Sequence, residues 1–110
     1  MTPAKFRSLA LALPTVFESA HMGHADFRVK GRIFATLGYP DESYAMVKLT
    51  REQQLSFMQK APDVFAPCAG GWGRGGATSV RLPAAGVDLL RVALEAASKN
   101  VGSHGKKKNG

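Results

Sequence analysis

The sequence predicts one α+β domain, a two-layer unit in which helices cover one face of an antiparallel sheet of about five strands. Apolar residues recur at helical spacing near both ends of the chain and once in its second half, whereas the middle holds short runs of β-favouring residues. Short turns join most of these runs, and strands joined by short turns pair antiparallel. The predicted order is α-β-β-β-β-α-β-α, and 110 residues are a usual length for one domain.

The first helix is predicted over residues 2–13. Thr2 can accept hydrogen bonds from the unpaired N–H groups at its start, and Pro3 suits the first helical position because it has no N–H to leave unpaired. Pro14 ends the helix. Its apolar face consists of residues three and four apart, namely Phe6, Leu9, Ala10 and Leu13.

Four strands are predicted next, over residues 15–21, 26–29, 32–37 and 44–49. The second and third strands are joined by a turn in which Gly31 can adopt the positive φ that a tight hairpin needs. A two-residue turn would place Val29 opposite Arg32 and Phe27 opposite Phe34. A three-residue loop would shift this pairing by one residue and move every side chain to the other face, and the sequence leaves both registers open.

The second helix is predicted to begin at Thr50, because Thr50 and Gln53 have the spacing of a capping box. Its predicted apolar face consists of Leu55, Met58 and Ala61. Pro62 ends it, and residues 62–76, which are rich in proline and glycine, are predicted to form a long loop. The last strand is predicted over residues 77–82 from their alternation of apolar and polar side chains.

The third predicted helix runs from Val87 to Val101, with Asp88 near its positive end. The domain is therefore predicted over residues 1–101. Residues 102–110 contain no apolar side chain and are predicted to be a basic, disordered tail. The formal net charge is +7, but four of the fifteen basic residues lie in 99–110, so residues 1–98 hold eleven basic and eight acidic side chains.

The expected compartment is the cytoplasm, with no membrane partner. No apolar run approaches the ~20 residues of a membrane span, and the N-terminal residues lack the pattern of a signal peptide. A single cysteine, Cys68, excludes an internal disulfide. No pattern in the sequence indicates an oligomeric state.

The segment from Gly71 to Gly76 matches the G-x-G-x-x-G pattern of dinucleotide sites. Such a site needs the glycines directly after a strand and at the start of a helix, so that the pyrophosphate meets the helix N-terminus. Here the glycines follow a loop and precede a strand, which favours a flexible or bulged loop instead. If the loop binds a ligand, Trp72 can stack on a base and Arg74 can contact a phosphate.

The hairpin around Gly31 concentrates three cations, Arg28, Lys30 and Arg32, which can contact phosphates or can simply be a solvated turn. The soft metal ligands are His21, His24, Cys68 and His104, and they lack the spacing of a metal site, so no metal or other cofactor is predicted. No flanking pattern supports a nucleophilic cysteine, and the acidic residues form no catalytic couple. We therefore do not expect an enzyme.

Three segments carry a shared pattern, namely Asp26–Leu37 in the hairpin, Val47–Leu49 followed by Gln53–Met58 at a strand-to-helix step, and Gly70–Thr78. Together they resemble the MmcQ/YjbR family. The first is similar to its Phe-x-Val-x-Gly-Lys-hydrophobic-Phe-Ala hairpin signature, and the third to a Gly-Trp-Gly-x-x-Gly-Ala-Thr segment of one subgroup. The resemblance runs in order over residues 4–101 and departs at Ser98, where the subgroup usually has tryptophan. It implies a frataxin/CyaY-like fold and a "double wing" DNA-binding arrangement.

Two functions are predicted. The first is a non-catalytic DNA-binding protein that contacts double-stranded DNA through the phosphates, using Arg28, Lys30, Arg32, Trp72 and Arg74. The second is a domain that binds a small molecule or a protein on its open sheet face, lined by Trp72, Phe34 and Tyr44. A continuous basic face favours the first function, and an apolar concave pocket favours the second.

Overall fold

The computed structural model describes residues 1–107, and among them the side chains of residues 1–102. This part of the chain forms six strands, four α-helices and one short 3₁₀ helix. In order they are α1 (Pro3–Leu11), β1 (Val16–His21), β2 (His24–Val29), β3 (Arg32–Leu37), β4 (Tyr44–Lys48), α2 (Arg51–Lys60), β5 (Phe65–Pro67), α3 (Gly70–Arg74), β6 (Ala77–Arg81), η1 (Leu82–Ala84) and α4 (Val87–Lys107).

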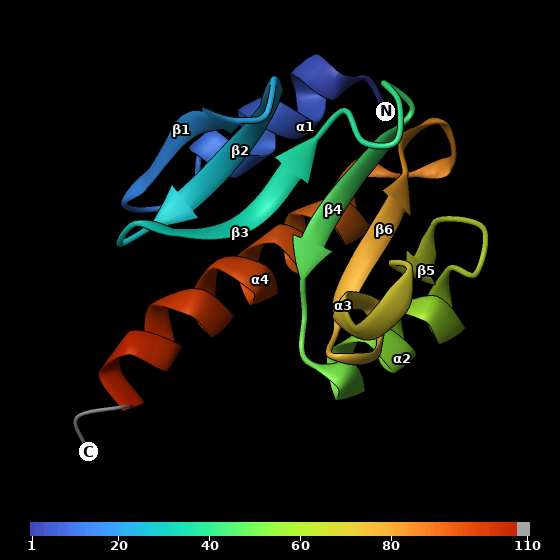
Figure 1. Ribbon diagram of the computed structural model, residues 1–110. Helices are drawn as coiled ribbons and strands as arrows, with labels where there is room; N and C mark the ends of the chain where they lie inside the picture. The colour runs from blue at the N-terminus through green and yellow to red at the C-terminus, as the bar shows by residue number, and fades with distance from the viewer. Residues whose placement is uncertain (108–110) are drawn as a thin grey trace.

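The strands form one open antiparallel sheet in the order β1-β2-β3-β4-β6-β5. Figure 1 shows α4 crossing behind the strands with α1 beside it, while the short helix α3 lies in front of β6. The core fills the space between the sheet and the helices behind it. Phe6 of α1 packs against Phe27 of β2, and Phe57 of α2 packs against Phe65 of β5. The predicted α+β class is confirmed, with six strands rather than about five; α1 and α4 lie behind the sheet as expected, whereas α3, which was not predicted, lies in front of it.

The expected helix starts are confirmed by hydrogen bonds that local sequence encodes. The Thr2 hydroxyl accepts a hydrogen bond from the backbone N–H of Lys5, and Pro3 occupies the first position of α1. At the start of α2, the Thr50 hydroxyl accepts from the N–H of Gln53, and the Gln53 side chain accepts from the N–H of Thr50. Both ends of this capping box therefore satisfy N–H groups that a helix start leaves unpaired.

The β2–β3 hairpin has the two-residue turn, with positive φ at both Lys30 and Gly31, and Val29 pairs with Arg32. The expected pairing of Phe27 with Phe34 is wrong, because a β-bulge adds one residue to β3 and Phe27 pairs with Ala35. A bulge lets two successive side chains point the same way. Phe34 is accordingly fully buried, like its neighbour Ala35, and it does not line an open sheet face.

Residues 62–76 are not the loop that the prolines and glycines predicted, because they contain β5 and α3. The buried face of α2 also differs from the prediction, since Gln54 and Phe57 are buried while Leu55 is 48% exposed. Gln54 is buried because its amide donates to the carbonyls of Gly73 and Ala77 and to the Thr78 hydroxyl. A polar side chain on a helix can be buried when partners from other elements satisfy it.

Helix α4 continues to Lys107, beyond the expected end at Val101. The prediction of a disordered tail from residue 102 is therefore wrong for the backbone of residues 102–107. Glycine costs only about 1 kcal/mol in a helix interior relative to alanine, so Gly102 and Gly105 do not forbid continuation of a helix already anchored on the sheet. Residues 108–110 lie outside the described residues.

Candidate functional site

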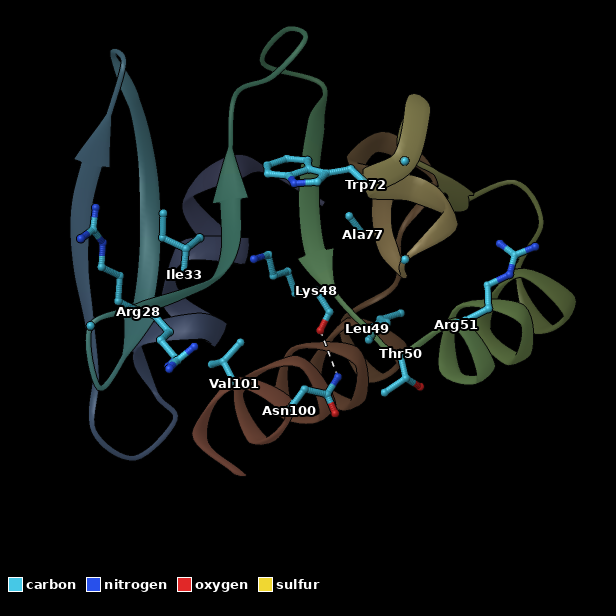
Figure 2. A pocket seen from close by; sticks show the side chains of 14 residues that line it. Arg28, Ile33, Lys48, Leu49, Thr50, Arg51, Trp72, Ala77, Asn100 and Val101 are labelled. Carbon is cyan, nitrogen blue, oxygen red and sulfur yellow. Dashed lines mark hydrogen bonds between the residues drawn. The ribbon is translucent and has the colours of Figure 1, made fainter. Parts of the chain in front are cut away.

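An open groove of about 810 Å³ lies where the β2–β3 hairpin, the end of β4 and the helix α3 come together (Figure 2). Lys48 and Ala77 are cross-strand partners on its floor, and their neighbours Val47 and Thr78 are fully buried. Because side chains alternate between the two faces of a strand, Lys48 and Ala77 point away from the core. The groove is therefore on the sheet face opposite to the one that α1 and α4 cover.

The lining of the groove carries four cations, and none of the described residues that line it is acidic. The cations are Arg28, Arg32, Lys48 and Arg51. They come from two places in the sequence, namely the β2–β3 hairpin and the short segment from the end of β4 to the first residue of α2. Like charges gathered in one concavity focus a positive potential there, which attracts anions.

Asp26 holds Arg28 in one orientation. The Nε and Nη2 atoms of Arg28 donate to the two carboxylate oxygens of Asp26 at 2.8 and 3.1 Å, and Asp26 is fully buried. These hydrogen bonds, together with the charge of Asp26, raise the pKa of Arg28 above its ordinary value, although partial desolvation opposes the rise. A guanidinium group has five N–H donors, so the remaining ones stay available to a ligand. Figure 2 shows Arg28 on the hairpin, across the groove from α3.

Trp72 forms the wall opposite the hairpin. Its side chain extends from α3 above the end of β4, and it is 64% exposed (Figure 2). The Lys48 ammonium lies 5.9 Å from the centroid of the indole ring, which is within the range of a cation–π interaction. The groove therefore combines an exposed aromatic surface with the cations around it.

The glycines of the G-x-G-x-x-G pattern position α3 by close packing. A Cβ atom at Gly73 would lie 1.7 Å from the Cys68 carbonyl oxygen, and one at Gly76 would lie 2.0 Å from the Leu49 carbonyl oxygen. Gly76 also has a φ of +118°. These glycines allow the backbone of α3 to approach β4 and β5, and the expected flexible loop is replaced by a short packed helix that carries Trp72.

Asn100 of α4 closes the lower end of the groove. Its side-chain amide donates to the Lys48 carbonyl at 3.0 Å and to the Gln53 Oε1 atom at 2.8 Å, and Gln53 belongs to the capping box of α2. Figure 2 shows the first of these bonds between α4 and the end of β4. The Asn100 side chain therefore links α4 to the end of β4 and to the start of α2.

Of the five site residues expected from the sequence, the structure brings Arg28, Arg32 and Trp72 together in the groove. Lys30 lies exposed at the turn of the hairpin and Arg74 lies exposed on α3, and neither lines the groove. For the second expected function, Phe34 is buried in the core and Tyr44 lies at the other end of β4, so only Trp72 is in place.

The sequence analysis missed three groove residues, Lys48, Arg51 and Asn100. A signal for Lys48 was present, because a lysine between the apolar residues Val47 and Leu49 indicates the solvent side of a strand. Arg51 follows the capping threonine directly, so its place at the start of a helix was also readable. Nothing local indicated that Asn100 reaches across to β4.

Outside the groove, the described side chains include no cluster of three or more His, Cys, Asp or Glu residues that could hold a metal ion. Cys68 is half-buried, and desolvation raises the pKa of its thiol. Within the described part of the chain, no helix has the length and apolar character needed to cross a membrane.

Comparison with known proteins identifies relatives by family and by fold. A family model described as YjbR matches residues 11–97. The crystal structure of a Deinococcus radiodurans protein with the domain DUF419 superposes with a TM-score of 0.73 at 22% sequence identity, covering 91% of this chain and 78% of that one. At this identity the likeness shows a shared fold only. No curated protein matches the chain.

Proposed function

This chain belongs to the YjbR family, and we propose that it is a DNA-binding protein without catalytic activity that contacts phosphates through the groove on its open sheet face. The observation that carries the proposal is the charge of the lining, in which Arg32, Lys48 and Arg51 join Arg28, and the buried Asp26 that pairs with Arg28 is the acidic residue beside it. Phosphate contacts from arginine and lysine supply most of the affinity in non-specific DNA binding.

The geometry of the arginines supports phosphate as the group that is bound. Guanidinium groups match the spacing of phosphate oxygens and form charge-assisted hydrogen bonds to them. Arg28 is already oriented by Asp26, so less side-chain entropy is lost when it binds a ligand. The groove also begins at the basic hairpin, which extends the cationic surface to Lys30.

A non-catalytic role agrees with the composition of the groove. General acid–base catalysis uses a positioned side chain whose pKa lies near the working pH, most often histidine or a carboxylic acid. The described residues that line the groove include neither, nor a cysteine. The cations and the indole there are suited to binding.

The second candidate function is binding of a small anionic molecule, and the concavity of the site favours it. Clefts that hold small ligands measure roughly 300–1,000 Å³, a range that includes this groove. Ile33, Leu49 and Val101 add apolar surface to its lining. The likeness to frataxin/CyaY proteins, the cytoplasmic location and a protein partner stay predictions.

The DNA proposal is tested by fluorescence anisotropy of a labelled duplex with the full chain over a range of salt concentrations. Four phosphate contacts predict a slope of about −3 to −4 for log affinity against log salt concentration. Arg32→Ala and Lys48→Ala should each weaken binding and reduce the magnitude of the slope by about one.

Two control variants separate the groove from the rest of the basic surface. Lys5→Ala removes an exposed cation from α1, outside the groove, and should leave the slope unchanged. Lys30→Ala reports on contacts made by the tip of the hairpin. Binding that is lost in Lys30→Ala but unaffected in Lys48→Ala would show that the tip and not the groove contacts DNA. Absence of binding at low salt to the duplex and to a single strand of the same length would refute the DNA proposal and leave the small anion as the function to test.

A further inference from the structure

We propose that the groove takes single-stranded nucleic acid, with an unpaired base stacked on Trp72 and the neighbouring phosphates bound by Arg28 and Arg32. This inference rests on the proposed function and narrows its ligand. It follows from an arrangement that a phosphate-binding surface alone does not need, namely an aromatic wall on one side of a cationic groove and a fixed guanidinium on the other (Figure 2).

Trp72 is the element that points to a base. The indole is 64% exposed, although the helix that carries it is closely packed through its backbone. Trp72 is also the only tryptophan in the sequence. Proteins that bind single strands combine a positive groove with aromatic side chains on which bases stack. The Lys48 ammonium lies 5.9 Å from the centroid of the indole ring and so places a further positive charge beside the aromatic surface.

A duplex fits this arrangement poorly. In a double helix the faces of the bases are covered by their neighbours, and an aromatic side chain reaches them only as a wedge that unstacks a base step. Trp72 lines a concave surface together with Ala77 and Lys48, and it does not stand at a protruding tip. A single strand exposes the faces of its bases and bends into a groove without that cost.

Arg28 and Arg32 form the phosphate side. They come from the two strands of one hairpin, near its turn, and the buried carboxylate of Asp26 fixes the Arg28 fork. The register pairs Arg28 with Ile33 and Arg32 with the core residue Val29, so the two side chains leave the hairpin on opposite faces, and both line the groove. The strand would therefore run across the sheet, from the hairpin to α3.

The experiment measures the anisotropy of a labelled short oligothymidylate with the full chain, beside a duplex with the same number of phosphates. Stacking on one aromatic side chain changes affinity roughly 5- to 150-fold. We expect the oligothymidylate to bind at least about tenfold more tightly than the duplex, and Trp72→Ala to remove this difference. Trp72→Phe should retain part of it. The salt slope should stay unchanged in Trp72→Ala, because stacking releases no counterions.

Tyr39→Ala is the matched control, since Tyr39 is 69% exposed but lies outside the groove, and it should bind like the unchanged chain. Circular dichroism of each variant checks that it is folded. Quenching of the single tryptophan by the oligothymidylate reports stacking in the unchanged chain.

Each other outcome overturns the inference in its own way. Equal affinity for strand and duplex, with no effect of Trp72→Ala, refutes the single-strand inference but leaves the DNA proposal intact. Complete displacement of the oligothymidylate by tripolyphosphate would show that the groove recognises negative charge alone. If thymidine monophosphate saturates the protein at the same concentration as the oligothymidylate does, the groove is a site for a small ligand. Absence of binding to either nucleic acid refutes both proposals.

Discussion

Gly73 is the point at which α3 is packed most closely, and Gly73→Ala tests whether that packing holds the helix in place. The added Cβ would lie 1.7 Å from the Cys68 carbonyl oxygen and 2.7 Å from its carbonyl carbon. Both atoms belong to the backbone, so no side-chain rotation relieves the clash. The Gly73 carbonyl also accepts a hydrogen bond from the buried Gln54 amide at 2.9 Å. Helix α3 must therefore move, and this interaction must weaken with it.

The expected loss of stability combines two opposing effects. Adding a methyl group to a closely packed site costs about 1–3 kcal/mol, and the upper part of this range applies because the atoms in contact are backbone. Alanine returns up to about 1 kcal/mol through its higher helix propensity. A net loss of about 2 kcal/mol lowers the melting temperature by roughly 8–16 °C in a domain of this size.

Thermal and urea unfolding, followed by circular dichroism, measure this loss. Gly71→Ala is the control in the same helix, because a Cβ there meets only the Arg74 Nη2 atom at 3.6 Å, an ordinary contact distance. It should leave stability unchanged or raise it by up to about 1 kcal/mol. Equal effects of the two substitutions, or a Gly73→Ala variant as stable as the unchanged chain, would refute the packing role of Gly73.

Two further predictions concern the same region. Gln54→Ala should lower the free energy of unfolding by about 1–3 kcal/mol, because it removes the hydrogen bonds that this fully buried amide donates to Gly73, Ala77 and Thr78, whereas Gln59→Ala on the exposed side of α2 should change little in urea unfolding. Burial raises the pKa of Cys68, so the native thiol keeps its proton at a pH where the unfolded thiol has lost it. Alkylation by iodoacetamide should therefore be slower in the native chain than in urea at mildly alkaline pH, and stability should fall as pH rises past the ordinary thiol pKa, a dependence that Cys68→Ala should lack. Equal alkylation rates in the native chain and in urea would contradict the effect of burial.

The helix starts show how far local sequence determines this fold. The caps at Thr2 and Thr50 were predicted correctly because their hydrogen bonds join residues three positions apart. The hairpin turn was located by Gly31, and the order of most elements by the change between helical and strand periods. Each of these features depends on interactions within a few residues, so the sequence alone contains the information.

The groove shows where local sequence is insufficient. Residues 62–76 look like a loop in isolation, yet Gln54 and the neighbouring strand give them partners that make β5 and α3 possible. Phe34 is in the core because a bulge changes the register of β3, and no local signal indicated that extra residue.

Whether a given cation belongs to the site was decided in the same way, by contacts between distant parts of the chain. Lys48, on the open face of β4, meets Trp72 of α3, while its backbone carbonyl is held by Asn100 of α4. The sequence by itself determined the local elements, the basic hairpin and the presence of a tryptophan in the glycine-rich segment. Only the tertiary structure determined which of these side chains share one groove, because their separation in space is set by the packing of the sheet against α2, α3 and α4.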